Sequence, residues 1–129
     1  VVLLVIGGPT HAFGMSRAST RADAVTKGAP GAAATGLRDW LDAPPTFEGK
    51  PWVATFDTRI DKPLIPGSAA RAAIRRLRKL GGRVLVGPQS FFVTDLEGPL
   101  RDGEISRANE WAWEILSSLG RHGLVGKPI

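Results

Sequence analysis

The sequence predicts an α/β domain, built on a parallel sheet with helices on both faces. The apolar run Val1–Ile6 shows no alternation with polar residues, which is typical of a strand buried on both faces. Two later segments, Ala69–Leu80 and Glu104–Leu119, carry apolar residues at helical spacing. Strand-like and helix-like segments alternate along the chain, and this alternation is the pattern of successive βαβ units.

The first strand is followed by a predicted loop and two predicted helices. Glycines and a proline predict the loop over Gly7–Met15. Ser16 or Ser19 can cap a helix that continues to about Lys27. After a linker of small residues, Thr35 can cap a short helix. One face of that helix carries Leu37, Trp40 and Leu41.

The second strand is predicted over Trp52–Phe56, with a polar loop from Asp57 to Gly67 behind it. Ser68 is the expected cap of the clearest helix, Ala69–Leu80. The apolar stripe of this helix is Ala70, Ala73, Ile74, Leu77 and Leu80. Its basic side carries Arg71, Arg75, Arg78 and Lys79.

The third strand is predicted in "RVLVG", and "QSFFVT" after Pro88 is expected to extend it past a bend. Asp102 is the expected cap of the last helix, which Gly120 would end. Trp111 falls near its buried stripe and Trp113 on the far side. The stripe itself is Ile105, Ala108, Ala112, Ile115, Leu116 and Leu119. Residues 1–120 are thus expected to form one domain, followed by a loose tail over 121–129.

Composition excludes several function classes. The chain has 129 residues, of which 43% are hydrophobic, and no cysteine, so disulfides and thiolate metal sites are excluded. Its apolar runs are far shorter than the ~20 residues of a membrane span, and no signal-peptide pattern precedes them, so a cytoplasmic protein without membrane contact is expected. The net charge of +5 permits acidic partners without requiring them.

Common catalytic and cofactor motifs are missing from the sequence. Neither a GxGxxG dinucleotide fingerprint nor a GxxxxGK[ST] phosphate loop occurs. The segment "GMSRA" lacks the second glycine of a nucleophile elbow. With only two histidines, no transition-metal site is expected. No catalytic residue can be assigned from these patterns.

The loops that follow the predicted strands are the candidate ligand site, because ligands of such sheets bind at the carboxyl ends of the strands. In the first loop Thr10 and His11 can hydrogen-bond a heteroaromatic ring, and Phe13 can stack against it. The alternative is a plain connection with Phe13 tucked into the core. His11 has a near-neutral pKa suited to proton donation, although a lone surface histidine often serves only as a hydrogen-bonding group.

The second loop begins with "FDTR", Phe56–Arg59, which places an acid, a hydroxyl and a cation behind a strand. These groups either face the same ligand or form a surface ion pair of Arg59 with Asp57 or Asp61. The basic side of the Ala69–Leu80 helix raises a nucleic-acid hypothesis. A solvated helix face explains it as well, and no aromatic residues interleave with its arginines to stack bases, which disfavours nucleic acid.

Several segments together resemble flavodoxin-like proteins over nearly the whole chain. "VVLLVIGGPTHAFGMS" is similar to the third strand and loop of the quinone-reductase branch, with its G-x-P-T-x-[FY]-G pattern. "GLRDWLD" resembles the helix that follows, and "KPWVATFDTR" resembles the fourth strand with its ring-contacting loop. "GGRVLVGPQSFFV" and "GPLRDGEISRANEWAWEI" are similar to the fifth strand and the closing helix.

This resemblance implies a doubly wound parallel sheet of strand order 2-1-3-4-5 that binds FMN at the strand ends. One side of the isoalloxazine would be lined by Pro9, Thr10, His11, Ala12, Phe13 and Gly14. The other side would be lined by Phe56, Asp57, Thr58 and Arg59. An FMN-dependent oxidoreductase or electron carrier is the implied function, with a redox protein or a quinone-like small molecule as partner.

The chain departs from this family at its beginning. The matching region starts at the family's third strand, so the first two strands and the phosphate loop have no counterpart, and weak FMN affinity is expected. The first strand would have an open edge, which a longer chain, another subunit or a homo-oligomer could cover. The positive charge also differs from the acidic electron carriers. A non-enzymatic interaction domain that no longer binds cofactor is therefore the alternative.

Overall fold

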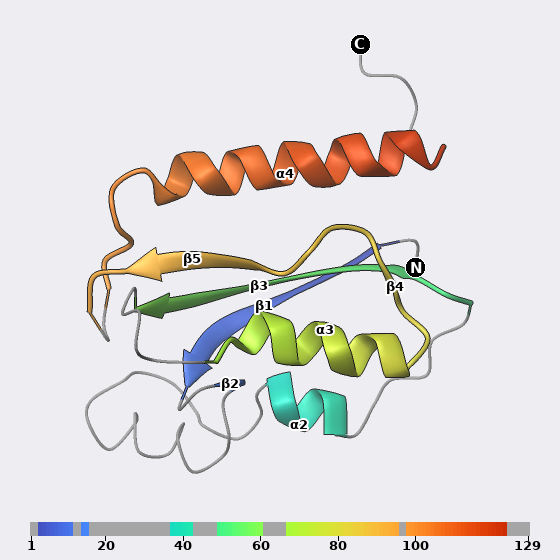
Figure 1. The fold of residues 1–129 in the computed structure, drawn as a ribbon, viewed down its shortest axis with the longest axis horizontal. Coiled ribbons are helices and arrows are strands. Elements are labelled where there is room, and N and C mark those ends of the chain that lie inside the picture. The colour runs from blue at the N-terminus through green and yellow to red at the C-terminus, as the bar shows by residue number, and fades with distance from the viewer. Residues whose placement is uncertain are drawn as a thin grey trace.

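The computed structural model describes residues 3–11, 14–15, 37–42, 49–60, 67–95 and 98–123. These residues form a mixed α/β fold (Figure 1). In chain order the elements are β1 (Leu3–His11), β2 (Gly14–Met15), α2 (Leu37–Asp42), β3 (Trp52–Ile60), α3 (Ala69–Lys79), β4 (Arg83–Val84), β5 (Gln89–Val93) and α4 (Glu104–Arg121). Among the helices described, none is both long and apolar enough to cross a membrane.

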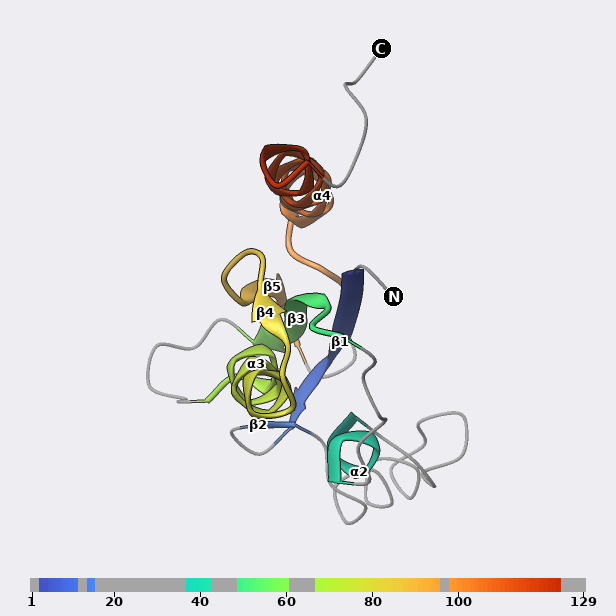
Figure 2. The ribbon, with the colours of Figure 1, turned by 90° about the vertical axis from the view of Figure 1, so that its right-hand side faces the viewer.

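The sheet is parallel apart from one short strand. β3 is its central strand and pairs in parallel with β1 on one edge and with β4 and β5 on the other. The short β2 runs antiparallel to the end of β1. Helices α2 and α3 lie on one side of the sheet and α4 lies on the other (Figures 1 and 2). The prediction of an α/β fold with a parallel sheet is therefore confirmed.

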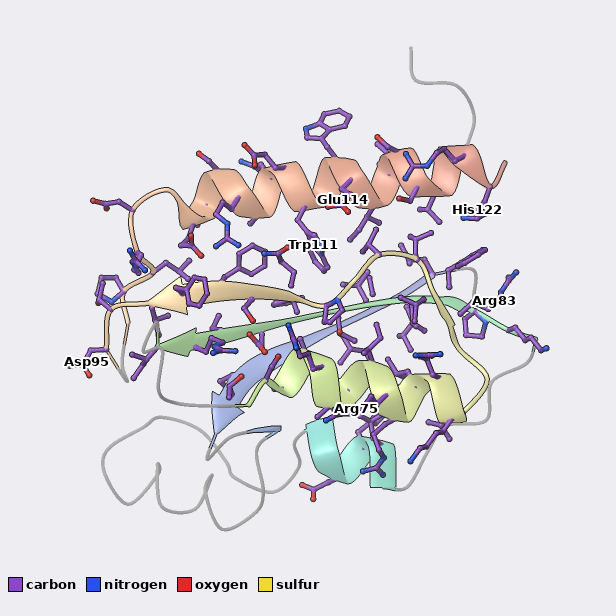
Figure 3. All side chains as sticks on the ribbon, viewed as in Figure 1. Arg75, Arg83, Asp95, Trp111, Glu114 and His122 are labelled. Atoms are coloured by element: carbon purple, nitrogen blue, oxygen red, sulfur yellow. The ribbon has the colours of Figure 1, made fainter. Side chains whose placement is uncertain are left out.

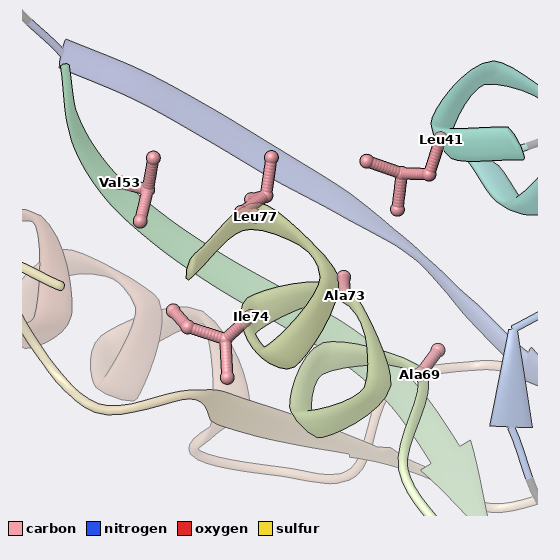
Figure 4. Packing of buried hydrophobic residues seen from close by; sticks show 6 residues of the cluster. All are labelled: Leu41, Val53, Ala69, Ala73, Ile74 and Leu77. Carbon is pink, nitrogen blue, oxygen red and sulfur yellow. The ribbon is translucent and has the colours of Figure 1, made fainter. Parts of the chain in front are cut away.

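Two hydrophobic layers hold the helices against the sheet, one on each face. Side chains of β3 alternate between them, as the period of a strand requires, with Val53 in one layer and Ala54 in the other. The first layer lies under α3 and includes Leu41 of α2 (Figure 4). The second lies under α4 and is built around Phe91 and Trp111.

Helix α3 follows its prediction closely. Ser68 is the N-cap, and its hydroxyl accepts a hydrogen bond from the backbone N–H of Arg71 at 3.2 Å. The helical residues end at Lys79, one position before the predicted end, and Gly81 continues with a positive φ. The buried side contains Ala70, Ala73, Ile74 and Leu77, while Leu80 packs at the border of the core. Helical periodicity was sufficient to identify this element.

The predicted ends of the first two strands are wrong. Gly7–His11 is not a loop, because β1 continues through it, and β3 likewise continues past Phe56 to Ile60. The two strands pair without a break from Leu3 opposite Trp52 to Pro9 opposite Thr58. Backbone pairing with a neighbouring strand satisfies the peptide groups and so extends both strands beyond their apolar cores.

The end of the molecule opposite the strand carboxyl ends is closed by a stack of side chains. The guanidinium carbon of Arg83 lies 4.2 Å from the centroid of the Trp52 ring. On the same indole ring, His122 lies at a centroid distance of 4.3 Å. Arg121, expected in a loose tail, is the last residue of α4, and His122 caps that helix. Residues 124–129, like the predicted helix from Ser16 or Ser19 to Lys27, lie outside the described residues.

The third strand and the last helix differ from their predictions in detail. β4 and β5 are separated by a bend that includes Pro88, and both pair with β3, as expected. The N-cap of α4 is Gly103, with φ of 86°, rather than Asp102. Gly120 does not end the helix. Trp111 is buried and Trp113 is 65% exposed, which confirms their assignment.

Part of the predicted buried stripe of α4 is wrong. Ile115 and Leu119 are buried, and Ala108 packs against their cluster. Ile105, Ala112 and Leu116 are exposed instead. The reason is that α4 contacts a sheet that is only a few strands wide. Its apolar arc is broader than the surface it covers, a relation that periodicity along one helix does not reveal.

Candidate functional site

The carboxyl ends of β1 and β3 lie side by side, which brings the two predicted ligand-binding segments together. Gly8 is opposite Asp57 and Pro9 is opposite Thr58. Pro9 is exposed, whereas Thr58 and Arg59 are half-buried. The Thr10 hydroxyl accepts a hydrogen bond from the backbone N–H of Ala69 at 3.1 Å, so it joins β1 to the start of α3.

Asp57 is fully buried beneath the first turn of α3. Its Oδ2 accepts hydrogen bonds from the Ser68 hydroxyl and, at 3.0 Å, from the backbone N–H of Ala70. A carboxylate at a helix N-terminus also interacts favourably with the helix dipole. Oδ1 is buried and has no hydrogen-bond partner among the described residues. In this arrangement Asp57 fastens α3 to β3 and does not lie on the surface of the edge.

The remaining predicted residues are described only in part. Ala12 and Phe13 lie outside the described residues. For His11 and Gly14 the backbone is described, and the two residues pair across the antiparallel contact of β1 with β2. The described parts of the first predicted segment therefore run antiparallel to each other, and Thr10 contacts the start of α3.

Phe56 and Thr58 face the opposite side of the sheet from Asp57 and Arg59. They line an apolar cavity of about 320 Å³ under the start of α4. The ring centroid of Phe56 lies 6.1 Å from that of Phe91 and 5.8 Å from that of Trp111, all in edge-to-face geometry. Figure 3 shows Trp111 directed from α4 toward the sheet. Its Nε1 is buried and has no partner among the described residues.

Glu104 also borders this cavity and holds β5 to α4. Its Oε2 accepts a hydrogen bond from the backbone N–H of Phe92 at 2.7 Å. The same oxygen forms an ion pair with Arg107 at 2.6 Å. Burial alone would raise the pKa of Glu104. The hydrogen bonds from Arg107 and Phe92, with the charges of Arg107 and Arg101, outweigh burial and lower this pKa. Glu104 is therefore a structural carboxylate that is ionised at neutral pH.

A second cavity lies on the α3 side of the sheet, between the end of β3 and the first turns of α3. Its volume is about 350 Å³, and its lining includes Arg59, Arg71 and Arg75. Sequence reasoning placed Arg59 at the strand end and the other two on a helix face, but did not bring them together. The i, i+4 spacing of Arg71 and Arg75 showed that they share a face. Arg59 lies beside these two arginines only because α3 packs on β3.

The described residues at this edge do not form a metal site. Within the part of the chain that the structure describes, no group of three or more His, Cys, Asp or Glu side chains could hold a metal ion. Comparison with protein-family models, curated proteins and solved structures finds no match to this chain. The function of the chain is therefore inferred from the geometry of the carboxyl edge of the sheet.

Proposed function

We propose that the chain belongs to a flavodoxin-like, FMN-binding domain that works as an oxidoreductase or electron carrier. The observation that carries this proposal is the pairing of Gly8 with Asp57 and of Pro9 with Thr58. Two segments that resemble the ring-contacting loops of flavodoxin-like proteins thereby share one edge of the sheet. Flat heterocycles bind at such edges of parallel sheets.

The described residues at this edge are compatible with a flat ring. A Cβ added to Gly8 would meet no atom within 4 Å, so the backbone there is open to close approach. Pro9 is exposed, and Thr58 and Arg59 are partly accessible. Asp57 would support the edge through α3 rather than touch the ring, because its side chain is fully buried.

FMN, when bound, supplies the electron-accepting chemistry, and the chain positions it. Pro9 and the backbone of Gly8 would lie against one part of the flavin. Arg59, at the same strand end, would supply a positive charge that attracts an anionic group of the bound cofactor. The electron acceptor in this proposal is a quinone-like small molecule or a redox protein.

Flavin titration with a blocking substitution tests the proposal. A Cβ at position 8 meets no atom within 4 Å, so Gly8→Val should leave the protein folded while it blocks FMN binding. Gly87→Val is the matched control, since a Cβ at Gly87 also meets no atom within 4 Å. FMN fluorescence quenching measures both. Folded wild-type protein that takes up no FMN, or a Gly8→Val variant that binds it normally, would contradict the proposal.

A non-enzymatic interaction domain is the second candidate, and the free edge of β1 favours it. Among the described residues β1 is paired on that side only by β2, at Thr10 and His11. Val5 is 43% exposed. An apolar edge strand of this kind is a template for another polypeptide strand, here a second copy of the chain.

Sedimentation equilibrium tests this candidate. Val5→Lys should convert an associated form to monomer, because a lysine on an edge strand opposes strand addition. Ser117→Lys on the exposed side of α4 is the control and should change nothing. A wild-type protein that is monomeric at all concentrations would remove this candidate.

A further inference from the structure

The cavity on the α3 side has the composition of an anion site. It is lined by Arg59 from β3, Gly67 and Ser68 before α3, and Arg71, Ala72 and Arg75 from the first turns of that helix. The three charged residues of this lining therefore come from two elements, β3 and α3, that meet at the carboxyl edge of the sheet. Arg71 and Arg75 are exposed and Arg59 is half-buried, so the guanidinium groups can reach a ligand from solvent.

In the part of the chain that the structure describes, no ion pair joins the three arginines to an acidic side chain. The buried Asp57 carboxylate nearby is hydrogen-bonded to Ser68 and Ala70 instead. Glu104, on the other side of the sheet, forms its ion pair with Arg107. Arg71 and Arg75 are four residues apart on one helix face, where like charges repel and destabilise the helix. Adding Arg59 increases the positive potential, and a bound anion would relieve it.

The start of α3 does not itself supply free donors to this cavity. The backbone N–H groups of Ala69, Ala70 and Arg71 already donate to Thr10, Asp57 and Ser68. The positive end of the helix is thus partly neutralised by the buried Asp57 carboxylate. Binding strength must therefore come from the guanidinium groups.

The number and geometry of these groups favour phosphate over a carboxylate. A guanidinium group presents a planar fork of donors that matches two oxygens of a tetrahedral oxyanion. A phosphate monoester offers three oxygens and nearly two negative charges, enough to engage Arg59, Arg71 and Arg75 together. A carboxylate has two oxygens and a single charge.

We propose that this cavity, the Arg59/Arg71/Arg75 site, binds the phosphate group of a small phosphorylated ligand. The phosphate belongs either to the flavin of the proposed function or to a separate phosphorylated substrate, and the chemistry of recognition is the same in both. Inorganic phosphate is a probe for either source, so the site can be tested without any flavin.

A small ligand is favoured over a nucleic-acid backbone by the origin of the three charges. Arg59 comes from a strand end, outside the helix face that a nucleic acid would follow. Arg78 and Lys79, which continue that face, do not line the cavity. A contact along the whole basic side of α3 would use Arg78 as much as Arg75.

The first experiment titrates inorganic phosphate into the protein by isothermal calorimetry. Arg71→Gln and Arg75→Gln should each weaken phosphate binding about tenfold, since each removes one charge-assisted contact. Arg78→Gln is the matched control on the same helix and should leave phosphate affinity unchanged. An equal loss in Arg78→Gln would point to unspecific or nucleic-acid-type attraction and would overturn the proposal, as would the absence of phosphate binding to wild type.

An NMR measurement makes the test independent of any variant. Added phosphate should shift the backbone amide signals of Gly67 and Ser68, which line the cavity, and leave those of Gly103 at the start of α4 in place. Shifts spread evenly over basic surface residues would contradict a defined site. This readout remains valid even if one of the arginine variants is poorly folded.

A second titration identifies the source of the phosphate and separates this inference from the flavin proposal. If the flavin supplies it, Arg75→Gln weakens FMN binding but not riboflavin binding, and phosphate competes with FMN. If another ligand supplies it, FMN and phosphate bind together, and Arg75→Gln affects only phosphate. Phosphate binding without any flavin binding would support the site while contradicting the flavin proposal.

Discussion

The Phe56 ring of β3 occupies the space that a side chain at Gly7 of β1 would need. A Cβ built on Gly7 would overlap the Cζ and Cε atoms of that ring. The ring cannot easily move aside, because it is packed edge-to-face against Phe91 and Trp111. The "GG" pair of the sequence therefore consists of one glycine required by packing and one, Gly8, beside open space.

We expect Gly7→Ala to destabilise the protein by about 1–3 kcal/mol, the usual cost of overpacking a core. Gly8→Ala, one position along, is the control, and its free energy of unfolding should change by less than about 0.5 kcal/mol. Urea denaturation of the two variants measures the difference. Equal stabilities would show that Phe56 repacks freely.

Asp57→Ala should destabilise the protein by about 3 kcal/mol, because it leaves the buried N–H of Ala70 and the Ser68 hydroxyl without their acceptor. Thermal unfolding followed by circular dichroism measures this loss. In a double-mutant cycle with Ser68→Ala the two effects should be less than additive, since the residues share one hydrogen bond. Strict additivity would contradict the coupling of Asp57 to the helix cap. Asp102→Ala, at an exposed acid, is the control.

Glu104 should make stability depend on pH in the acidic range. Its pKa is lower in the folded protein than in the unfolded chain, so on acidification the unfolded state binds a proton first. The stabilisation is complete above the ordinary pKa of a glutamate and is lost as pH falls through the folded-state value. Glu104→Gln should flatten this part of the curve of melting temperature against pH. Glu110→Gln, exposed on the same helix, should leave the curve unchanged.

The two tryptophans of α4 should respond oppositely to truncation. Trp111→Ala removes a buried ring and should cost about 3–5 kcal/mol of stability. Trp113→Ala, at an exposed site, should stay within about 0.5 kcal/mol. Chemical denaturation measures both, and a large loss for Trp113→Ala in the monomer would contradict its placement.

Much of the fold follows from patterns within single segments. Ser68 before an amphipathic run predicts α3 with its cap, and the alternation of segments predicts the parallel sheet. The extension of β1 to Pro9 and of β3 to Thr58 could not be predicted, because it depends on pairing between residues about fifty positions apart. The last residues of the two strands pair with β2 and β5 instead. Glycine and proline in the first segment favoured a loop by their local preferences, and the neighbouring strand overrode them.

The candidate site shows the same division. Local spacing places Arg71 and Arg75 on one helix face, since this relation depends only on the period of the helix. The prediction that Asp57 follows a strand was wrong, because β3 continues through this residue to Ile60. Packing of α3 across β3 then buries the Asp57 carboxylate under the helix and adds Arg59 to the two helical arginines. Periodicity is a property of neighbouring residues, whereas burial and charge clustering arise from contacts between distant ones, so only the folded chain decides which charged groups are available to a ligand.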